Sequence, residues 1–121
     1  MADLSVQTVT FAGLNHTSAS ADVAGDTFTN DGRTFLLFTN ANASARTLTI
    51  AANDTTRPGF GTIATPDTTV TIPGSGTNGG LCVVGPFPTE RFNDLSTGKV
   101  SLGYSAVTGL TVAAVKLTKY Q

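Results

Sequence analysis

Hydrophobic and polar residues alternate one by one in several short stretches of this chain. Leu48 and Ile50 each follow a threonine, and Val70 and Ile72 are placed in the same way. Successive side chains of a strand point to opposite faces, so this period of two predicts strands with one buried face and one wet face. A third run of this kind opens at Thr111.

Turn signals between the apolar runs predict where the other strands begin and end. The cluster Asn30-Asp31-Gly32 favours a tight turn, because these residue types tolerate positive φ. The continuous apolar run 35–38 predicts a strand that is buried on both faces or lies at an interface. The expected strands are 4–10, 26–29, 33–39, 46–52, 61–64, 67–72, 81–84, 99–104 and 110–117, with one helical turn at 89–93.

About seven to nine short strands, with a turn signal every 8–12 residues, predict an all-β fold. The expected architecture is an antiparallel β-sandwich, either jelly-roll-like or immunoglobulin-like. A chain of 121 residues supports one sizeable core and leaves no room for a second domain. Within this single domain, residues 1–25 are expected to form an N-terminal strand and a flexible arm, and residues 26–121 the sandwich.

Composition excludes several classes of partner. Only 12% of the residues are charged, and three Lys and four Arg cannot form the basic footprint that duplex binding needs, so we expect no nucleic-acid partner. No apolar run approaches the roughly 18 residues of a membrane span, so we expect no membrane partner, and the opening MADLSV lacks the pattern of a signal peptide. Cys82 is the only cysteine, which excludes an intrachain disulfide and the usual zinc cluster, and we expect no metal and no cofactor.

Matches to catalytic motifs fail on their context. Residues 74–79 fit the pattern GxGxxG, but Pro73 precedes them and a strand-like run follows, so a hairpin loop is the better interpretation. His16 is the only histidine, and no Cys or carboxylate cluster accompanies it. The aspartates lie in turn contexts, where they cap backbone amides. We therefore expect that the protein is not an enzyme, and a small hydrolase using His16 is the remote alternative.

Two phenylalanines lie in loops that suit a docking role. Phe60 stands between two glycines and Phe87 between two prolines. Interface cores lose charged residues and gain aromatic ones, and proline lowers the entropy that a loop loses on binding. The alternative is that both rings plug the ends of the sandwich core. The candidate contacts with a shell or another subunit are Phe60, Arg57, Phe87, Arg91 and Phe92.

An ordered set of segments carries a resemblance to a known family. The segments are NDGRTFLL (30–37), TLTI (47–50), TVTIP (69–73), VGPFP (84–88), FND (92–94) and YSAVTGLTVAAV (104–115). Together they resemble the small head decoration or cement proteins of tailed bacteriophages. The likeness extends from about residue 26 to residue 117 and is strongest at the Gly85-Pro86-Phe87-Pro88 turn and in the final strand.

This resemblance implies a role in the virion. A decoration protein binds the outer surface of the phage head, bridges neighbouring capsomers and has the major capsid protein as its partner. The family also implies a homo-oligomer, with a trimer favoured. Two alternatives stay open: another virion component, such as a tail or head–tail joining subunit, and a carbohydrate-binding sandwich module, for which two tyrosines and no tryptophan are weak support.

Overall fold

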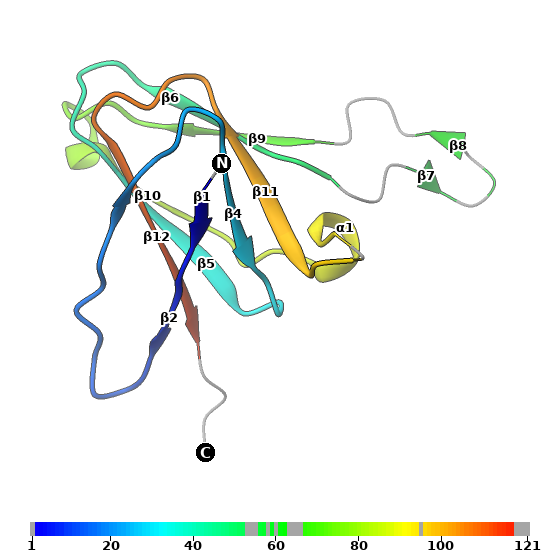
Figure 1. Ribbon diagram of the computed structural model, residues 1–121. Coiled ribbons are helices and arrows are strands. Elements are labelled where there is room, and N and C mark those ends of the chain that lie inside the picture. Colours follow the sequence, from blue (N-terminus) through cyan, green and yellow to red (C-terminus); the bar gives the residue numbers. More distant parts are fainter. Residues whose placement is uncertain are drawn as a thin grey trace.

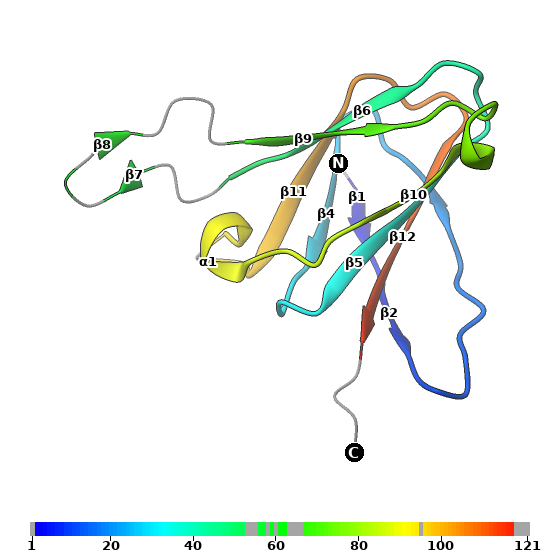
Figure 2. The same cartoon turned by 180° about the vertical axis from the view of Figure 1, so that it is seen from behind.

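The computed structural model describes residues 2–52, 56–57, 59, 61–62, 67–94 and 96–117. In this part of the chain, two sheets of five strands pack face to face, which confirms the predicted all-β sandwich (Figure 1 and Figure 2). The first sheet has the order β1 (Ala2–Leu4), β4 (Asp26–Thr29), β11 (Lys99–Tyr104), β6 (Arg46–Ile50) and β9 (Thr68–Ile72). The second has the order β10 (Leu81–Val84), β5 (Thr34–Asn40), β12 (Leu110–Leu117) and β2 (Val6–Val9), and β3 (Ala19–Ser20) also pairs with β12.

The N-terminal segment belongs to both sheets. One strand was expected at 4–10, but the structure has two, divided at Ser5, because the chain leaves the first sheet after Leu4 and enters the second at Val6. β1 runs parallel to β4 and β2 runs parallel to β12, whereas the other strand pairs of the two sheets are antiparallel. Residues 1–25, expected to be one strand and an arm, thus supply strands to both layers.

The core lies between the two sheets and follows the alternation that the sequence predicts. Leu48 and Ile72 are fully buried, and the threonines beside them point outward. Burying a leucine or valine side chain contributes about 1.5–3 kcal/mol, so these inner faces hold the layers together. The core cluster includes Leu4, Phe28, Leu36, Phe38, Leu48, Ile50, Ile72, Phe87, Phe92, Val100, Leu102, Leu110, Val112 and Ala114.

The turns form as their side chains predict. At the end of β4, Asn30 Oδ1 accepts a hydrogen bond from the Gly32 amide, and Asp31 Oδ1 accepts one from the Arg33 amide. Asp94 caps the Ser96 amide in the same way, which confirms the expected role of the turn aspartates. The glycine-rich segment 74–80 ends in a short 3-10 turn, η1 (Asn78–Gly80), and leads from β9 of the first sheet to β10 of the second. It is a loop before a strand, but the expectation of a hairpin is wrong, because β9 pairs with β6 and β10 pairs with β5.

Four small elements of the described residues lie outside the two sheets: η1, one helical turn and two short strands. α1 (Thr89–Phe92) is the predicted helical turn. β7 (Thr56–Arg57) and β8 (Gly61–Thr62) pair only with each other, and the ribbon shows them standing away from the sandwich (Figure 1). The predicted strand 61–64 corresponds to β8 in its first two residues, and the other two lie outside the described residues. No helix among the described residues is long and apolar enough to cross a membrane.

Candidate interaction face

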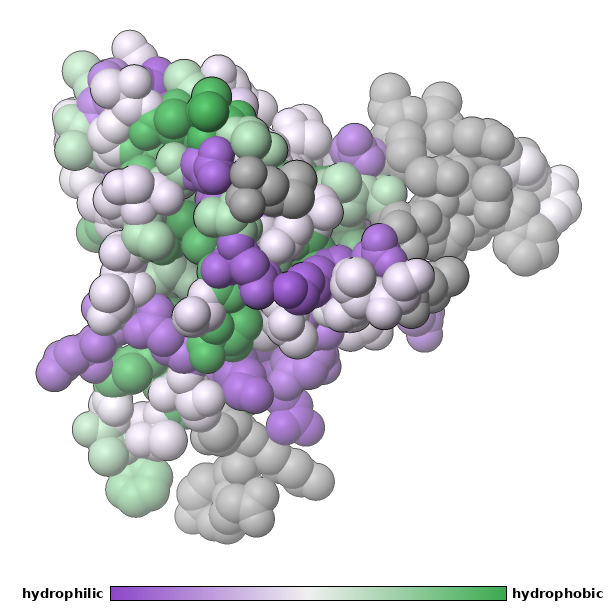
Figure 3. Space-filling model, in the orientation of Figure 1, coloured by the Kyte–Doolittle hydropathy of each residue, from purple (hydrophilic) through white to green (hydrophobic). Residues whose placement is uncertain are grey.

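The outer face of the first sheet is polar. Thr27 and Thr29 of β4 lie on this face, and β6 and β9 add two cross-strand threonine pairs, Thr47 opposite Thr71 and Thr49 opposite Thr69. Threonine suits such a position, because its methyl group packs along the sheet while its hydroxyl stays in water. Figure 3 looks onto this side of the molecule, where hydrophilic residues gather across the middle.

The outer face of the second sheet is apolar. Leu37 of β5 lies between Val83 of β10 and Ala113 of β12, and Phe35 lies opposite Val115. Two further leucines at the ends of β10 and β12 extend this row. We call the exposed and half-buried part of this surface the apolar outer face, and it comprises Phe35, Leu37, Leu81, Val83 and Leu117. Ala113 and Val115 lie on the same side of β12 but are only 2% and 1% exposed, so they offer no surface to a partner.

Much of the apolar outer face is open to solvent. The exposed fractions are 53% for Leu81, 65% for Val83 and 52% for Leu117. Phe35 and Leu37 are half-buried, whereas Leu36 and Phe38, on the other side of the same strand, belong to the core. The continuous apolar run 35–38 therefore joins core residues with residues of an apolar surface.

A groove opens at one end of the apolar outer face. It has a volume of about 460 Å³ and is lined by Gly32, Arg33, Phe35, Val83, Gly85, Pro86 and Leu117. Arg33 is its single charged lining residue, at the turn that leads into β5. The groove thus combines apolar walls with one cation at the rim.

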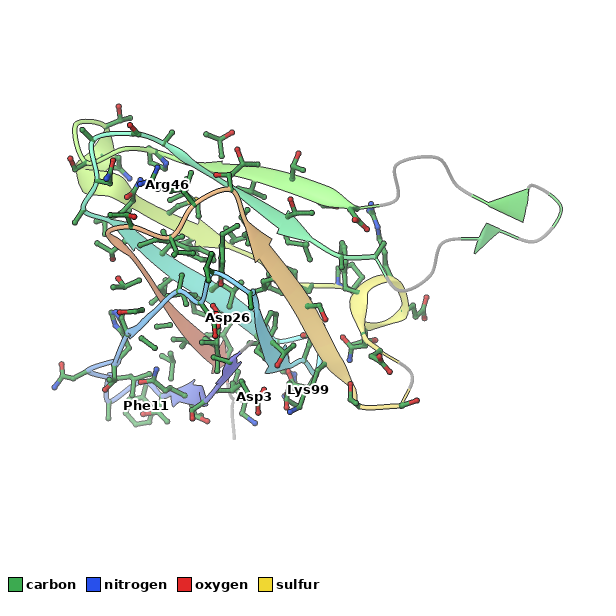
Figure 4. All side chains as sticks on the ribbon, turned by 45° about the horizontal axis from the view of Figure 1, so that its top comes forward. Asp3, Phe11, Asp26, Arg46 and Lys99 are labelled. Carbon is green, nitrogen blue, oxygen red and sulfur yellow. The ribbon has the colours of Figure 1, made fainter. Side chains whose placement is uncertain are left out.

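A loop beside this groove presents a phenylalanine to solvent. Residues 10–18, the Phe11 loop, connect β2 to β3, and the Phe11 side chain is fully exposed at the periphery of the molecule (Figure 4). The Gly13 amide donates a hydrogen bond of 2.9 Å to the Thr10 carbonyl and closes a turn around Phe11. Sequence reasoning expected a loop here but did not single out Phe11, although a lone phenylalanine in a small, polar stretch was a visible signal.

A side-chain clamp holds the base of the Phe11 loop. Gln7 Nε2 donates a hydrogen bond to the Thr17 carbonyl, and the Thr17 amide donates one to Gln7 Oε1, both at 2.8 Å. The amide group of Gln7 thereby pairs with the backbone of Thr17 as a neighbouring strand would. The loop is anchored at both ends, by this clamp and by the pairing of β3 with β12.

Two of the predicted contact residues lie in the core. Phe87 is 2% exposed and Phe92 is 6% exposed, so neither offers its ring to a partner, and the expectation of exposed anchors at these positions is corrected. The Phe87 ring packs against Phe28, with 5.3 Å between centroids, and edge-on against Phe92 at 6.2 Å. The Phe87 ring packs between the two sheets because it finds apolar neighbours there. Its neighbour Phe28 lies far from it in the sequence, so the sequence alone does not show this contact.

The other predicted contacts lie on separate elements. Arg91 is exposed, and its guanidinium carbon lies 4.9 Å from the centroid of the Phe92 ring. Arg57 belongs to β7, on the hairpin that stands away from the sandwich (Figure 1). Phe60 lies outside the described residues.

One buried carboxylate stands out among the titratable groups. Asp26 is fully buried. Its Oδ2 accepts a hydrogen bond of 2.6 Å from the Tyr104 hydroxyl and one of 3.3 Å from the Asp22 amide. Its Oδ1 has no hydrogen-bond partner within the described part of the chain. Burial, together with the hydrogen bond to Asp26, raises the pKa of Tyr104. Figure 4 places Asp26 between the sheets. A single carboxylate beside a tyrosine is a structural contact rather than an acid–base pair open to a substrate.

Other reactive groups are scattered. His16 is exposed in the Phe11 loop, and burial raises the pKa of the Cys82 thiol, which packs against the core. Within the described residues, no group of three or more His, Cys, Asp or Glu side chains could hold a metal ion.

The two outer faces therefore differ in what they offer a partner. The first presents threonine hydroxyl groups, and the second presents apolar side chains, a groove and an adjacent exposed phenylalanine. Comparisons of this chain with models of protein families, with curated proteins and with solved structures found no match.

Proposed function

We propose that this protein is a non-enzymatic structural component of a tailed bacteriophage particle. In this role it is a decoration protein that binds the outer surface of the head and stabilises contacts between capsomers. The observation that carries the proposal is the contrast between the threonine-rich outer face of the first sheet and the apolar outer face of the second.

Exposed leucine, valine and phenylalanine side chains favour adhesion to another surface. Transfer of a fully exposed side chain of this kind out of water contributes about 1.5–3 kcal/mol, and Leu81, Val83 and Leu117, which are about half exposed, contribute roughly half as much each. Contiguous apolar patches on small domains mark interaction sites, and the cores of interfaces are depleted of charged residues. Charged residues make up 12% of this chain, so close contact with a large neighbour involves little desolvation of ions.

A decoration protein needs only a modest interface in each copy. A shell presents its binding sites many times. An oligomer that binds several of these sites at once has a higher overall affinity than a single copy, without any new kind of contact. The major capsid protein is the proposed partner and a homo-oligomer is the proposed state, both on the ordered segments between residues 26 and 117 that resemble the family. The β7–β8 hairpin, which carries Arg57, is a second candidate contact, because it projects beyond the sandwich (Figure 1).

Binding to emptied heads tests the proposal. Purified protein is mixed with expanded phage heads that lack it, the heads are sedimented, and the bound copies are counted. We expect saturation at a copy number comparable with that of the shell subunits. Val83→Ser should weaken binding, whereas Val23→Ser, which changes another highly exposed valine outside the apolar outer face, should not.

The copy number separates this role from its closest rival. A tail or head–tail joining subunit would saturate at a few copies per particle. Protein that stays in the supernatant at micromolar concentration, with heads of a phage whose genome encodes it, would contradict head binding altogether.

A further inference from the structure

We propose that the groove on the apolar outer face receives the Phe11 side chain of a second copy of this chain. The inference goes beyond head binding and does not require it, because it concerns contacts between copies in the free protein. Val83 contributes to both surfaces, so the pair has to separate before the apolar outer face binds the head. It assigns a role to the Phe11 loop, which contributes no residue to the core cluster.

The Phe11 loop has the properties of a preorganised anchor. A fully exposed phenyl ring leaves an apolar surface of about 200 Å² in water, which is unfavourable unless a partner covers it. The turn at Gly13 and the clamp between Gln7 and Thr17 restrain the loop near Phe11 and at its base before binding. Docking of the ring therefore involves little further loss of loop entropy.

The groove has the size and chemistry to take this ring. A cavity of about 150 Å³ holds a benzene molecule, and the groove, at about 460 Å³, accommodates a phenyl ring together with part of its loop. Phe35, Val83 and Leu117 supply apolar walls. Arg33 at the rim adds a cation that stacks favourably on an aromatic face.

The anchor and the groove lie at the same end of the molecule. Leu117 in the groove pairs with Val9 across the β12–β2 ladder, and Phe11 follows Val9 by two residues. When an anchor and its receptor share one patch, a two-fold axis lets each copy give its ring and receive that of the other. The structure thus favours a reciprocal pair of contacts.

The exposed apolar area matches what a stable pair of copies needs. Phe11, Leu81, Val83 and Leu117 together expose roughly 500 Å² of apolar surface, from their exposed fractions. A standard interface buries about 800 Å² per partner, of which about 57% is apolar, or roughly 450 Å². A net charge of −1 adds little repulsion between copies.

Sedimentation analysis of the free protein tests this proposal without any shell. We expect the wild-type chain to self-associate reversibly between about 1 and 100 μM, the range of ordinary specific interfaces. Phe11→Ala removes both anchors of a reciprocal pair and should raise the dissociation constant about 100-fold, since a buried aromatic anchor is worth ten-fold or more. Val23→Ala, the control, removes an exposed apolar side chain elsewhere and should leave association unchanged.

A mixing experiment identifies the groove as the receptor. Val83→Asp places a charge in the groove while leaving Phe11 intact, and Phe11→Ala leaves the groove intact. Each variant alone should associate about 100-fold more weakly than the wild type, whereas an equimolar mixture should form a heterodimer through one intact contact and associate only about ten-fold more weakly. Circular dichroism and thermal unfolding check that both variants keep the fold.

The outcomes are separable from those of head binding. A wild-type chain that stays monomeric at 100 μM, or that associates as strongly after Phe11→Ala as after Val23→Ala, overturns the contact between copies. Neither result bears on head binding, because no heads are present in this measurement.

Discussion

Tyr104 donates a 2.6 Å hydrogen bond to the fully buried carboxylate of Asp26, across the β11–β4 ladder. The Tyr104 ring also meets Phe38 of the second sheet edge-on, with 6.2 Å between centroids. One side chain thus joins the two layers and gives the buried carboxyl group of Asp26 a short hydrogen bond.

Removal of this hydroxyl group should destabilise the protein. Tyr104→Phe leaves Asp26 Oδ2 with only the 3.3 Å bond from the Asp22 amide, so the free energy of unfolding should fall by about 1.5–3 kcal/mol. Urea unfolding at neutral pH measures the change. The double variant Asp26→Asn/Tyr104→Phe removes the buried charge as well and should recover part of the loss. Unchanged stability of Tyr104→Phe would show that the bond is not formed.

The same pair predicts a loss of stability at alkaline pH. Burial and the bond to Asp26 raise the pKa of Tyr104 in the folded state above its unfolded value of about 10. The stabilising contribution of Tyr104 is therefore fully present below about pH 10. Above this pH, the free energy of unfolding falls by up to about 1.4 kcal/mol per pH unit. Unfolding free energies between about pH 9 and 11.5 should fall less steeply in Tyr104→Phe than in the wild type, and equal slopes would exclude the phenol as the cause.

Neighbouring leucines on opposite sides of β5 should differ in their contribution to folding. Leu36 is fully buried in the core, so Leu36→Ala should cost about 2.7–5 kcal/mol. Leu37 faces outward and is half-buried, so Leu37→Ala should cost about 1 kcal/mol or less in the monomer. Chemical unfolding of the two variants at low protein concentration checks this pair, and equal losses would mean that the face of β5 is assigned incorrectly.

Two adjacent glycines in η1 provide a matched test of backbone packing. Both have positive φ, 65° for Gly79 and 74° for Gly80, and so Gly→Ala at either position costs about 1–2 kcal/mol from conformation alone. At Gly80 an added Cβ would also lie 2.1 Å from the Asn40 carbonyl oxygen, whereas at Gly79 it meets nothing within 4 Å. The midpoint of thermal unfolding should therefore fall clearly further for Gly80→Ala than for Gly79→Ala.

The ion pair between Asp3 and Lys99 should make a small, acid-sensitive contribution. The hydrogen bond from Lys99 Nζ, 2.9 Å long, lowers the pKa of Asp3 in the folded state. Its contribution is present above the unfolded pKa of about 4 and is lost as the pH falls through the lower folded pKa. For an exposed pair, Asp3→Asn should cost less than about 1 kcal/mol at pH 7.

A double-variant cycle with Lys99→Gln isolates this term. The coupling between the two positions should shrink as the pH falls through the lowered pKa of Asp3, and it should vanish at a pH low enough to protonate this carboxylate in both states. A coupling that persists at this pH would point to packing of the lysine stem rather than to charge.

The alternation of apolar and polar residues predicted most strands of this protein, because this pattern involves only consecutive residues of each strand. The bounds of β4, β10, β11 and β12 agree with the expected ranges 26–29, 81–84, 99–104 and 110–117. The turn at Asn30–Gly32 formed as expected, since its hydrogen bonds join residues two positions apart. These features need only near neighbours in the chain.

Which surfaces stay exposed depended on contacts between distant segments. Phe11 and Phe87 are the same residue type in irregular segments, yet one is fully exposed and the other lies in the core, because Phe28 and Phe92 surround only the second. The apolar run 35–38 predicted that β5 is buried on both faces or lies at an interface. The outer face around β5, however, is built by its pairing with β10 and β12, which lie more than 40 residues further along the chain. The sequence by itself thus determined most strands and the all-β class. The tertiary structure alone decided which apolar residues stay exposed, because side-chain alternation is a local property and burial is a property of the assembled sheets.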